Sequence, residues 1–226
     1  MATNQQVKLL GFVGSPIVAR AELALKLKGV EYEYIQESSL TNKSDLLLKS
    51  NPVYKRLPVL LHNDKPVCES LLIVEYVDET WTGHPILPSD PYHKALSRFW
   101  SSFIEDRVWP AVNKAAWNPN KQEREKGAEE AREALEILDK GLKVNDKFFN
   151  GDSVGLLDIA ALVIFYWIPI IQEACEFNAY SGDQYQNLEK RGQVVLNDPV
   201  VKGVLPPRDV LLSFFRARFQ SIIDSK

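Results

Sequence analysis

The stretch Val7-Lys8-Leu9-Leu10-Gly11-Phe12-Val13-Gly14-Ser15-Pro16 decides the fold. Its first half is a short apolar run that ends near a glycine, which predicts a buried strand. Ser15-Pro16 is a helix-start signal, because serine caps exposed amides and a proline at the first helical position loses no needed donor. The apolar pattern continues to Leu27, and Gly29 is the matching stop signal. The stretch therefore predicts a strand followed directly by a helix.

The pattern outward from this stretch predicts a small α/β domain. Asn63-Asp64-Lys65 reads as a tight hairpin turn, because Asx residues tolerate positive φ. We expect strands at 30–35, 58–62 and 66–68, and helices at 44–48 and from Ser70 onward. The order β-α-β-α-β-β-α, with one right-handed crossover and a final antiparallel pair, is the pattern of the thioredoxin-like α/β fold.

A proline-rich segment separates this region from a helical one. Three prolines between positions 85 and 91 prevent regular structure, as is typical of a domain boundary. Beyond it the helical period dominates, which predicts an all-α domain. We therefore expect an α/β domain at 1–82, a linker at 83–91 and a helical domain at 92–226. The expected helices are Tyr92–Trp117, Lys121–Lys143, Leu156–Ala174, Tyr185–Leu196 and Arg208–Ile223.

Composition excludes several classes of protein. The chain has 226 residues, 45% hydrophobic, with a net charge of −3, whereas a nucleic-acid binder normally has a basic face or tail. The longest apolar run, from Ile159 to Ile171, is shorter than the roughly 20 residues of a bilayer span and predicts a buried helix. The N-terminus has no secretory signal, and Cys68 and Cys175 lie far apart with no CxxC motif. We expect a soluble cytoplasmic protein with buried, unpaired cysteines.

Common catalytic signatures are missing. The sequence has no Walker A, GxGxxG, HExxH or GxSxG motif. The three histidines do not pair at the spacing of metal ligands, so we expect no metal site. Any chemistry must therefore use a hydroxyl group without an activating base.

Ser15 is the most informative residue for such chemistry. As a helix cap it would contribute about 1 kcal/mol of stability and nothing else. Alternatively, its hydroxyl donates a hydrogen bond to an anion at the start of the helix. A bound thiolate suits that position, because positive potential lowers a thiol pKa from about 8.5 toward neutrality.

Two further segments have both an ordinary and a functional interpretation. Leu57-Pro58 is either a trans bond at the start of an edge strand or a cis bond that turns the backbone of Leu57 outward for docking. Glu69-Ser70 is either ordinary helix capping or a subsite for a zwitterion, in which Glu69 binds an ammonium group and Ser70 with the helix start binds a carboxylate.

Lys43 and Arg56 are the candidate cations for a second carboxylate. Taken singly, each is more often an ordinary surface cation. Their functional interpretation depends on the fold bringing them together.

Together these residues resemble the plant tau-class glutathione S-transferases along essentially the whole chain. The resemblance rests on Gly11-Phe12-x-x-Ser15-Pro16, Asn42-Lys43-Ser44, the block from Asn51 to Leu60, and Glu69-Ser70 followed by Glu75 to Trp81. It implies a cytosolic homodimer that adds the thiolate of glutathione to hydrophobic electrophiles in xenobiotic detoxification and the plant stress response. Reduction of organic hydroperoxides is a further implied activity. Glutathione is a cosubstrate, and no cofactor is implied.

The resemblance also implies roles for single residues. Ser15 resembles the catalytic serine, and Leu57, with Pro58 as the cis-proline behind it, resembles the residue that pairs with the cysteinyl unit. Glu69 and Ser70 resemble the γ-glutamyl subsite, and Lys43 and Arg56 the pair facing the glycine carboxylate. Six aromatic residues are candidate electrophile contacts, although aromatics at helical spacing are usually core: Phe12, Trp109, Trp117, Trp167, Phe215 and Phe219.

Some positions depart from the family pattern or serve the fold. Val13 and Gly14 stand where Trp-Pro is common, and Ile17 where Phe is usual, so substrate preference is expected to differ. Gly14 should make the loop more mobile, and the missing indole should widen the electrophile pocket near Phe12. Asp158 resembles the family's buried capping residue, which we assign to folding.

Two other functions are weighed against transfer. One is a non-catalytic carrier that holds planar hydrophobic ligands in the aromatic cleft. The other is a thiol–disulfide oxidoreductase on the same fold, which is disfavoured because serine rather than cysteine occupies position 15.

Overall fold

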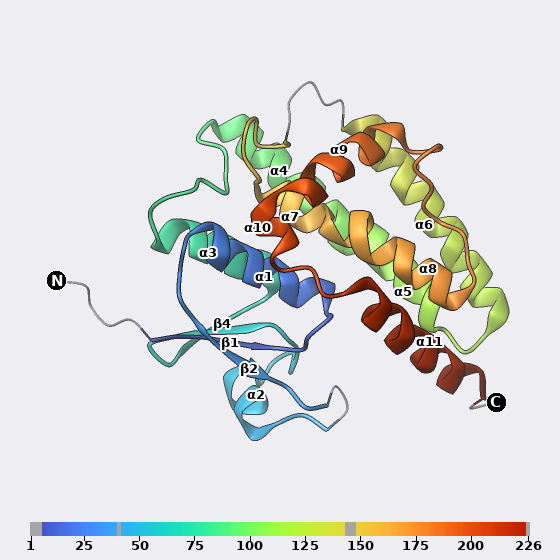
Figure 1. Ribbon diagram of the computed structural model, residues 1–226, viewed down its shortest axis with the longest axis horizontal. Helices are drawn as coiled ribbons and strands as arrows, with labels where there is room; N and C mark the ends of the chain where they lie inside the picture. Colours follow the sequence, from blue (N-terminus) through green and yellow to red (C-terminus); the bar gives the residue numbers. More distant parts are fainter. Residues whose placement is uncertain (1–5, 40–41, 143–147, 225–226) are drawn as a thin grey trace.

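The computed structural model describes residues 6–39, 42–142 and 148–224, and has a sheet domain packed beside a helical domain (Figure 1). The predicted fold class is confirmed, since the first part alternates strands and helices in the expected order. Its elements are β1 (Val7–Gly11), α1 (Pro16–Leu27), β2 (Glu33–Gln36), α2 (Asp45–Ser50), β3 (Val59–His62), β4 (Lys65–Cys68) and α3 (Ser70–Thr80).

The four strands form one mixed sheet in the order β2-β1-β3-β4. β1 pairs with β2 in parallel and with β3 antiparallel, and β3 pairs antiparallel with β4. Neighbouring residues of a strand face opposite sides. Leu9 belongs to the main core, which includes α1 and α3, whereas Leu10 packs with Leu47 of α2 in a second, smaller core. The sheet therefore carries two helices on one face and α2 on the other (Figure 1).

Two local predictions in this domain are corrected by the structure. β2 begins at Glu33 rather than at position 30. Ser70 is the first residue of α3 rather than its cap, and Glu69 occupies the cap position with φ of 70°. The hairpin turn is as expected, because Asn63 and Asp64 both have positive φ.

The second part of the chain is helical. Its elements are α4 (Pro91–Phe103), η1 (Ile104–Val108), α5 (Trp109–Trp117), α6 (Lys121–Gly141), α7 (Leu156–Leu162), η2 (Val163–Trp167), α8 (Ile168–Cys175), α9 (Gln186–Asn197), α10 (Pro199–Lys202) and α11 (Arg208–Asp224). The sequence did not predict α10. The predicted end of the second long helix, Lys143, lies outside the described residues.

Two of the predicted long helices contain a turn of π-helix, η1 and η2. Each π-turn comes just before a proline at the second position of the next helix, Pro110 in α5 and Pro169 in α8. A proline cannot donate the usual backbone hydrogen bond to residue i−4, and a wider turn accommodates that loss without ending the helix.

The apolar helical stretch Leu156–Cys175 forms the centre of this domain. It is long and apolar enough to cross a membrane, but 78% of its apolar window is buried inside the protein, in agreement with the predicted core helix. Asp158 in its first turn is fully buried and accepts hydrogen bonds from the amides of Gly155 (3.0 Å) and Phe149 (3.2 Å). Asp158 therefore has the capping role expected from the sequence.

Candidate functional site

Ser15 lies at the junction of β1 and α1. It is the N-cap of α1, with an extended backbone, and its Oγ accepts a hydrogen bond from the amide of Val18 at 3.4 Å. Its own amide donates to the carbonyl of Phe12 at 3.1 Å, which closes the turn before the helix. A serine hydroxyl that accepts a hydrogen bond still has its proton to donate. Ser15 can thus cap the helix and bind an anion at the same time.

A hollow of about 220 Å³ opens beside Ser15. It contains several of the predicted site residues: Ser15, Lys43, Arg56, Leu57 and Phe12. The other lining residues are Ile17, Glu37, Ser39, Leu47 and Lys55. The hollow thus combines two hydroxyls, three cations, one carboxylate and an apolar side, which suits a ligand that carries both anionic and apolar groups.

Glu37 fixes the loop that carries Lys43. Its amide donates to the carbonyl of Gly11 at 2.8 Å, which extends the pairing of β1 with β2. Its buried carboxylate accepts from the amide (3.0 Å) and the hydroxyl (2.8 Å) of Ser44, the N-cap of α2. A cap bonded on both sides has few ways to move, so Lys43 is held close to the sheet edge.

Asn51 fixes the loop that carries the other two cations. It is buried, its side-chain amide donates to the carbonyl of Arg56 at 3.0 Å, and its Oδ1 accepts from the amide of Tyr54 at 3.1 Å. Lys55 adopts a positive φ of 54° within this loop. The sequence analysis missed Lys55, although the adjacent basic pair Lys55-Arg56 was a usable signal.

The Leu57–Pro58 peptide bond is cis, which excludes the trans alternative, and the docking role of the Leu57 backbone stays a prediction. Leu57 is half-buried and lines the hollow, whereas Pro58 is buried and does not.

The predicted zwitterion subsite, Glu69 and Ser70, is not among the lining residues of this hollow. Glu69 is exposed at the start of α3. The hydroxyl of Ser70 is buried and accepts from Nη1 of Arg20 at 3.2 Å. Arg20 also bonds Glu105 and the carbonyl of Ala160 in the helical domain. This network fixes the start of α3 relative to α1 and to the helical domain.

Three of the predicted electrophile contacts are core residues instead. Trp167, Phe215 and Phe219 are 0%, 5% and 7% exposed. They pack in the interior because helices in contact exclude water from the faces that meet. Phe219 also lines a separate hollow of about 560 Å³ next to α6. Trp109 and Trp117 are half-buried, and neither lines the hollow beside Ser15.

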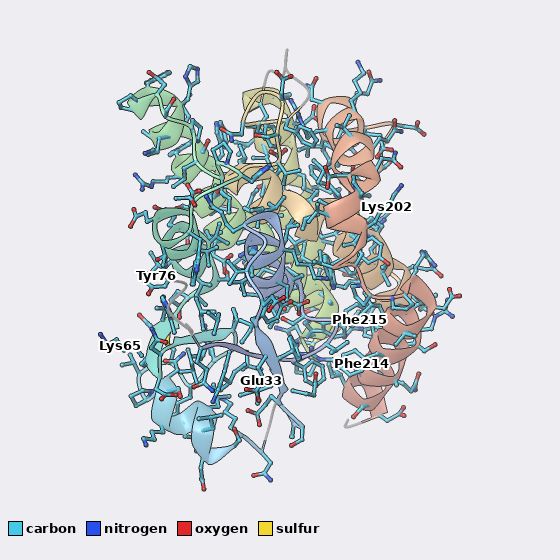
Figure 2. All side chains as sticks on the ribbon, turned by 60° about the vertical axis from the view of Figure 1, so that its left-hand side comes forward. Glu33, Lys65, Tyr76, Lys202, Phe214 and Phe215 are labelled. Carbon is cyan, nitrogen blue, oxygen red and sulfur yellow. The ribbon has the colours of Figure 1, made fainter. Side chains whose placement is uncertain are left out.

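The helical side of the cleft is instead represented by Phe214, which the sequence analysis missed. Its ring lies 5.9 Å from that of Phe12, centroid to centroid, and it is 40% exposed. Figure 2 labels Phe214 and Phe215 on α11: the ring of Phe214 contacts Phe12 of the sheet domain, and that of Phe215 contacts Trp117 of α5. Phe214 belongs to the same apolar helix as Phe215, and sequence periodicity does not decide which of two adjacent aromatics remains accessible.

A second hollow, of about 330 Å³, lies on the other side of the Ser15 loop. Glu22, Tyr32 and Tyr34 line it together with the segment from Gly203 to Pro207, and Ser15 and Trp167 line it from the loop side. Burial raises the pKa of the Glu22 carboxyl, against the opposing charge of Lys26. Burial, and then the charge of Glu22, raise the pKa of Tyr32 to about 12 and also that of Tyr34. This side of the loop therefore has no cationic side chain in its lining, unlike the hollow with Lys43.

Comparison with known proteins gives consistent results along the chain. Sequence models of the glutathione S-transferase N-terminal and C-terminal domains match residues 5–79 and 90–197. A "Probable glutathione S-transferase" of Glycine max is 54% identical over 225 residues, covering 100% of this chain and 99% of its own. "Glutathione S-transferase U8" of Arabidopsis thaliana is 45% identical, covering 98% and 99%.

Two solved structures are similar to the whole chain. The tau-class glutathione S-transferase of mango, Mangifera indica, has a TM-score of 0.85 and 38% identity, covering 94% of this chain and 98% of its own. Rice GST1, solved in complex with glutathione, has a TM-score of 0.86 and 28% identity, covering 97% and 99%.

Proposed function

Because this chain belongs to the glutathione S-transferase family, within its plant tau class, we propose that Ser15 is the group that keeps the thiol of bound glutathione deprotonated. The activity of the family is the conjugation of glutathione to electrophiles, and the relatives are named for transfer rather than for ligand carriage. The observation that carries the proposal is the position of the Ser15 hydroxyl, at the start of α1 and on the wall of the hollow that contains Lys43 and Arg56.

The proposed step needs no base on the protein. The amide of Val18 donates to Ser15 Oγ, which leaves the hydroxyl proton free to point at the sulfur. The partial positive charge at the start of α1 acts on the same atom. Both effects favour the thiolate over the thiol and therefore lower its pKa. The thiol proton passes to water, and the thiolate then attacks the electrophilic carbon and forms the carbon–sulfur bond. A substitution expels the leaving group with its bonding electron pair, and an addition to an activated double bond ends when the resulting carbanion takes a proton from water.

The remaining charged residues would bind the ends of the tripeptide. Lys43 and Arg56 supply cations for the glycine carboxylate, and the planar guanidinium of Arg56 can make a bidentate contact. The backbone of Leu57, next to the cis bond, would pair with the cysteinyl unit. Glu69 and Ser70 would bind the γ-glutamyl end. In this arrangement, the protein holds both ends of the tripeptide, which brings its sulfur to Ser15.

An apolar electrophile would approach from the side of α11. Phe12, Ile17 and Phe214 offer accessible apolar surface there. The departures at positions 13, 14 and 17 lie in or next to this surface, so they are proposed to tune the range of electrophiles.

The test of Ser15 is the pH dependence of conjugation in Ser15→Ala. We expect kcat to fall about a hundredfold at neutral pH, because removing one hydrogen-bond donor to developing charge typically has that effect. The rate should recover as the pH rises, since the thiol of the variant ionises without help above its own higher pKa. Equal rates for wild type and variant at neutral pH would remove Ser15 from the mechanism.

Two control variants separate catalysis from capping. Ser15→Thr keeps the hydroxyl and should retain most activity. The side chain of Asn120 caps α6 by accepting hydrogen bonds from two amides. Asn120→Ala should therefore cost about 1 kcal/mol of stability and leave the pH profile of conjugation unchanged. A pH shift in Asn120→Ala would mean that loss of any cap produces the effect.

We also propose that the protein is a homodimer. α3 and α4 are joined by the ion pair Glu75–Arg98 and expose large apolar side chains, among them Leu72 (59% exposed), Tyr92 (68%) and Phe99 (59%). Exposed apolar groups on one pair of helices suit a second copy of the chain. Phe99→Asp should produce monomers in light scattering, whereas an unchanged mass would place the contact elsewhere.

The cytoplasm is the proposed location. Cys68 is half-buried, Cys175 is buried, and both are free thiols, as is usual in a reducing compartment. Burial raises the pKa of Cys175 to about 12, so this thiol is unreactive at physiological pH.

A further inference from the structure

The π-turn η2 binds two segments of the cleft through two adjacent side chains. The indole N–H of Trp167 donates to the carbonyl of Gly14 at 2.8 Å, directly before Ser15. The hydroxyl of Tyr166 donates to the carbonyl of Pro206 at 2.5 Å, directly ahead of α11. The two rings contact each other edge to face, with centroids 5.2 Å apart. A single turn of the helical domain therefore contacts both walls of the cleft.

The loop that carries Ser15 meets the helical domain at Gly14, through this hydrogen bond and through close packing against Leu211 of α11. Gly14 adopts a φ of +91°, a conformation that L side chains rarely adopt, and a Cβ there would lie 2.7 Å from Cδ2 of Leu211 in α11. The preceding residue, Val13, is 61% exposed, and its amide donates to the side chain of Gln36 at 3.2 Å. The Trp167 bond is thus a hydrogen bond between this loop and the helical domain, and it adds to the packing of Leu211 against Gly14 and to the Val13–Gln36 bond.

α11 is also held in place by η2. Leu211, 3% exposed, packs beside Gly14, and Phe214, one helical turn further, faces Phe12. Tyr166 holds the segment that leads into α11, and the ion pairs of Arg208 and Arg216 with Glu173 hold α11 itself against α8. Tyr166 therefore contributes to the distance between Phe12 and Phe214. Trp167 is 0% exposed and lines the hollow of about 330 Å³ on the other side of the Ser15 loop, and its bond to the Gly14 carbonyl lets it act on Ser15 through the loop.

We propose that η2 is the positioning element of this site: Trp167 sets the place of Ser15, and Tyr166 sets the place of α11 and hence the width of the electrophile cleft. Both are positioning residues rather than catalytic ones. π-turns inside α-helices occur frequently at functional sites, and here Pro169 imposes the turn from within the chain's own sequence. The part of this inference that concerns Trp167 rests on the proposed role of Ser15.

Trp167→Phe tests that half, because it keeps an aromatic ring and removes the only N–H. The Gly14 carbonyl loses its donor, the loop relaxes, and the Ser15 hydroxyl is no longer held in place. We expect the pH midpoint of kcat for conjugation to rise by about half a unit to one unit, which makes the variant roughly 3- to 10-fold slower below the midpoint and equal to wild type well above it. A purely structural loss would lower the rate equally at all pH values.

The matched control is Trp100→Phe, since Trp100 is half-buried in α4 against Gly141 and does not contact the cleft. Its pH profile should equal that of wild type. Trp167→His, which restores a ring N–H, should recover part of the shift. A profile for Trp167→Phe that matches wild type would overturn the Trp167 half.

The double variant Ser15→Ala/Trp167→Phe separates this inference from the proposed function. If Trp167 acts through Ser15, the double variant should have the pH profile of Ser15→Ala alone. If Ser15→Ala has no pH shift, the proposed function fails. If Ser15→Ala shifts the profile and Trp167→Phe does not, the positioning role fails alone.

Tyr166→Phe tests the other half and removes one hydroxyl without a change of ring. We expect about a threefold change in the KM for a large aromatic acceptor, little change for a small one, and no change in the pH midpoint or in the KM for glutathione. If Tyr166→Phe had the wild-type KM for both the large and the small acceptor, the proposed role of Tyr166 would be wrong. That conclusion would hold whether or not Trp167→Phe behaved as expected or folded.

Discussion

The two walls of the cleft are built on different principles. On the sheet side, short loops at the ends of strands and helices carry the functional groups, and hydrogen bonds to nearby residues hold them. Ser15 bonds an amide three residues away, and Asn51 bonds a carbonyl five residues away. On the α11 side, aromatic contacts between distant segments place the groups, such as Phe12 with Phe214 and Trp117 with Phe215.

This difference determines what sequence change can do to each wall. A cap or loop bond is encoded within a few residues, so a substitution there has a local and specific effect. Packing of aromatic side chains depends on several helices at once, so a substitution there is shared among many contacts and each has a smaller effect. We therefore expect effects on charge and binding from the sheet side and effects on electrophile range from the α11 side.

The largest effect should come from Arg20, because it joins the sheet domain to the helical domain. Arg20→Met removes bonds to Ser70, Glu105 and the Ala160 carbonyl at a fully buried position. Loss of the guanidinium leaves the buried Ser70 hydroxyl and the Ala160 carbonyl without this donor, whereas the side chain of Glu105 is 38% exposed and can turn to water. We therefore expect a loss of about 2–4 kcal/mol in the free energy of unfolding by urea.

The matched control for Arg20 is an exposed pair. Lys140→Ala removes the ion pair with Glu136 on the surface of α6 and should change stability little. Equal losses of free energy in Arg20→Met and Lys140→Ala would contradict the role of Arg20 in joining the sheet domain to the helical domain.

The next largest effect is expected from Arg56→Ala, because this substitution changes only the sheet side of the cleft. A lost charge-assisted contact to a carboxylate is worth about 1.5 kcal/mol or more, so the KM for glutathione should rise about tenfold or more. The KM for the electrophile should remain the same. Lys49→Ala, a basic residue in the last turn of α2 that does not line the hollow, is the control. An equal rise in Lys49→Ala would indicate a general field of positive charge rather than a contact.

Much of the sheet domain was readable from the sequence because its signals are local. Ser15-Pro16 predicted the start of α1, and Asn63-Asp64 predicted the hairpin turn. The predictions that failed there depend on backbone details with no simple signal. Glu69 takes the cap position of α3 with a positive φ, although Ser70 is the better cap by residue type.

The sequence did not predict which residues of α11 face the cleft, because the candidates are of one chemical type. Phe214, Phe215 and Phe219 lie on one helix, and only tertiary packing leaves Phe214 accessible. The role of Trp167 was hidden for a related reason: its partner, the Gly14 carbonyl, lies 153 residues away in sequence. Local patterns predict which residues are apolar, whereas the assembled domains decide which of them face the cleft.

A smaller effect is expected from Gly14→Ala, which lies between the two walls. A positive φ costs an alanine about 1 kcal/mol, and the new Cβ would also push against Leu211 of α11. We expect a stability loss of about 1–2 kcal/mol by thermal unfolding, together with a reduced kcat. Gly29→Ala is the control, since it has positive φ but no atom within 4 Å of a Cβ. It should lose similar stability and keep its activity, and a loss of activity in Gly29→Ala would assign the effect to backbone strain alone.

The smallest effect should come from Phe214→Ala, which changes only the α11 side of the cleft. Phe214 is 40% exposed and contacts Phe12 through one ring pair, so its removal should cost less than about 1 kcal/mol of transition-state binding. The kcat/KM for a large aromatic acceptor should therefore fall a fewfold, with the KM for glutathione unchanged. Val210→Ala, at a 60% exposed position of the same helix, should change neither quantity. A rise in the KM for glutathione in Phe214→Ala would show that the two walls do not act separately, because a contact on the α11 side would then be needed to bind the tripeptide.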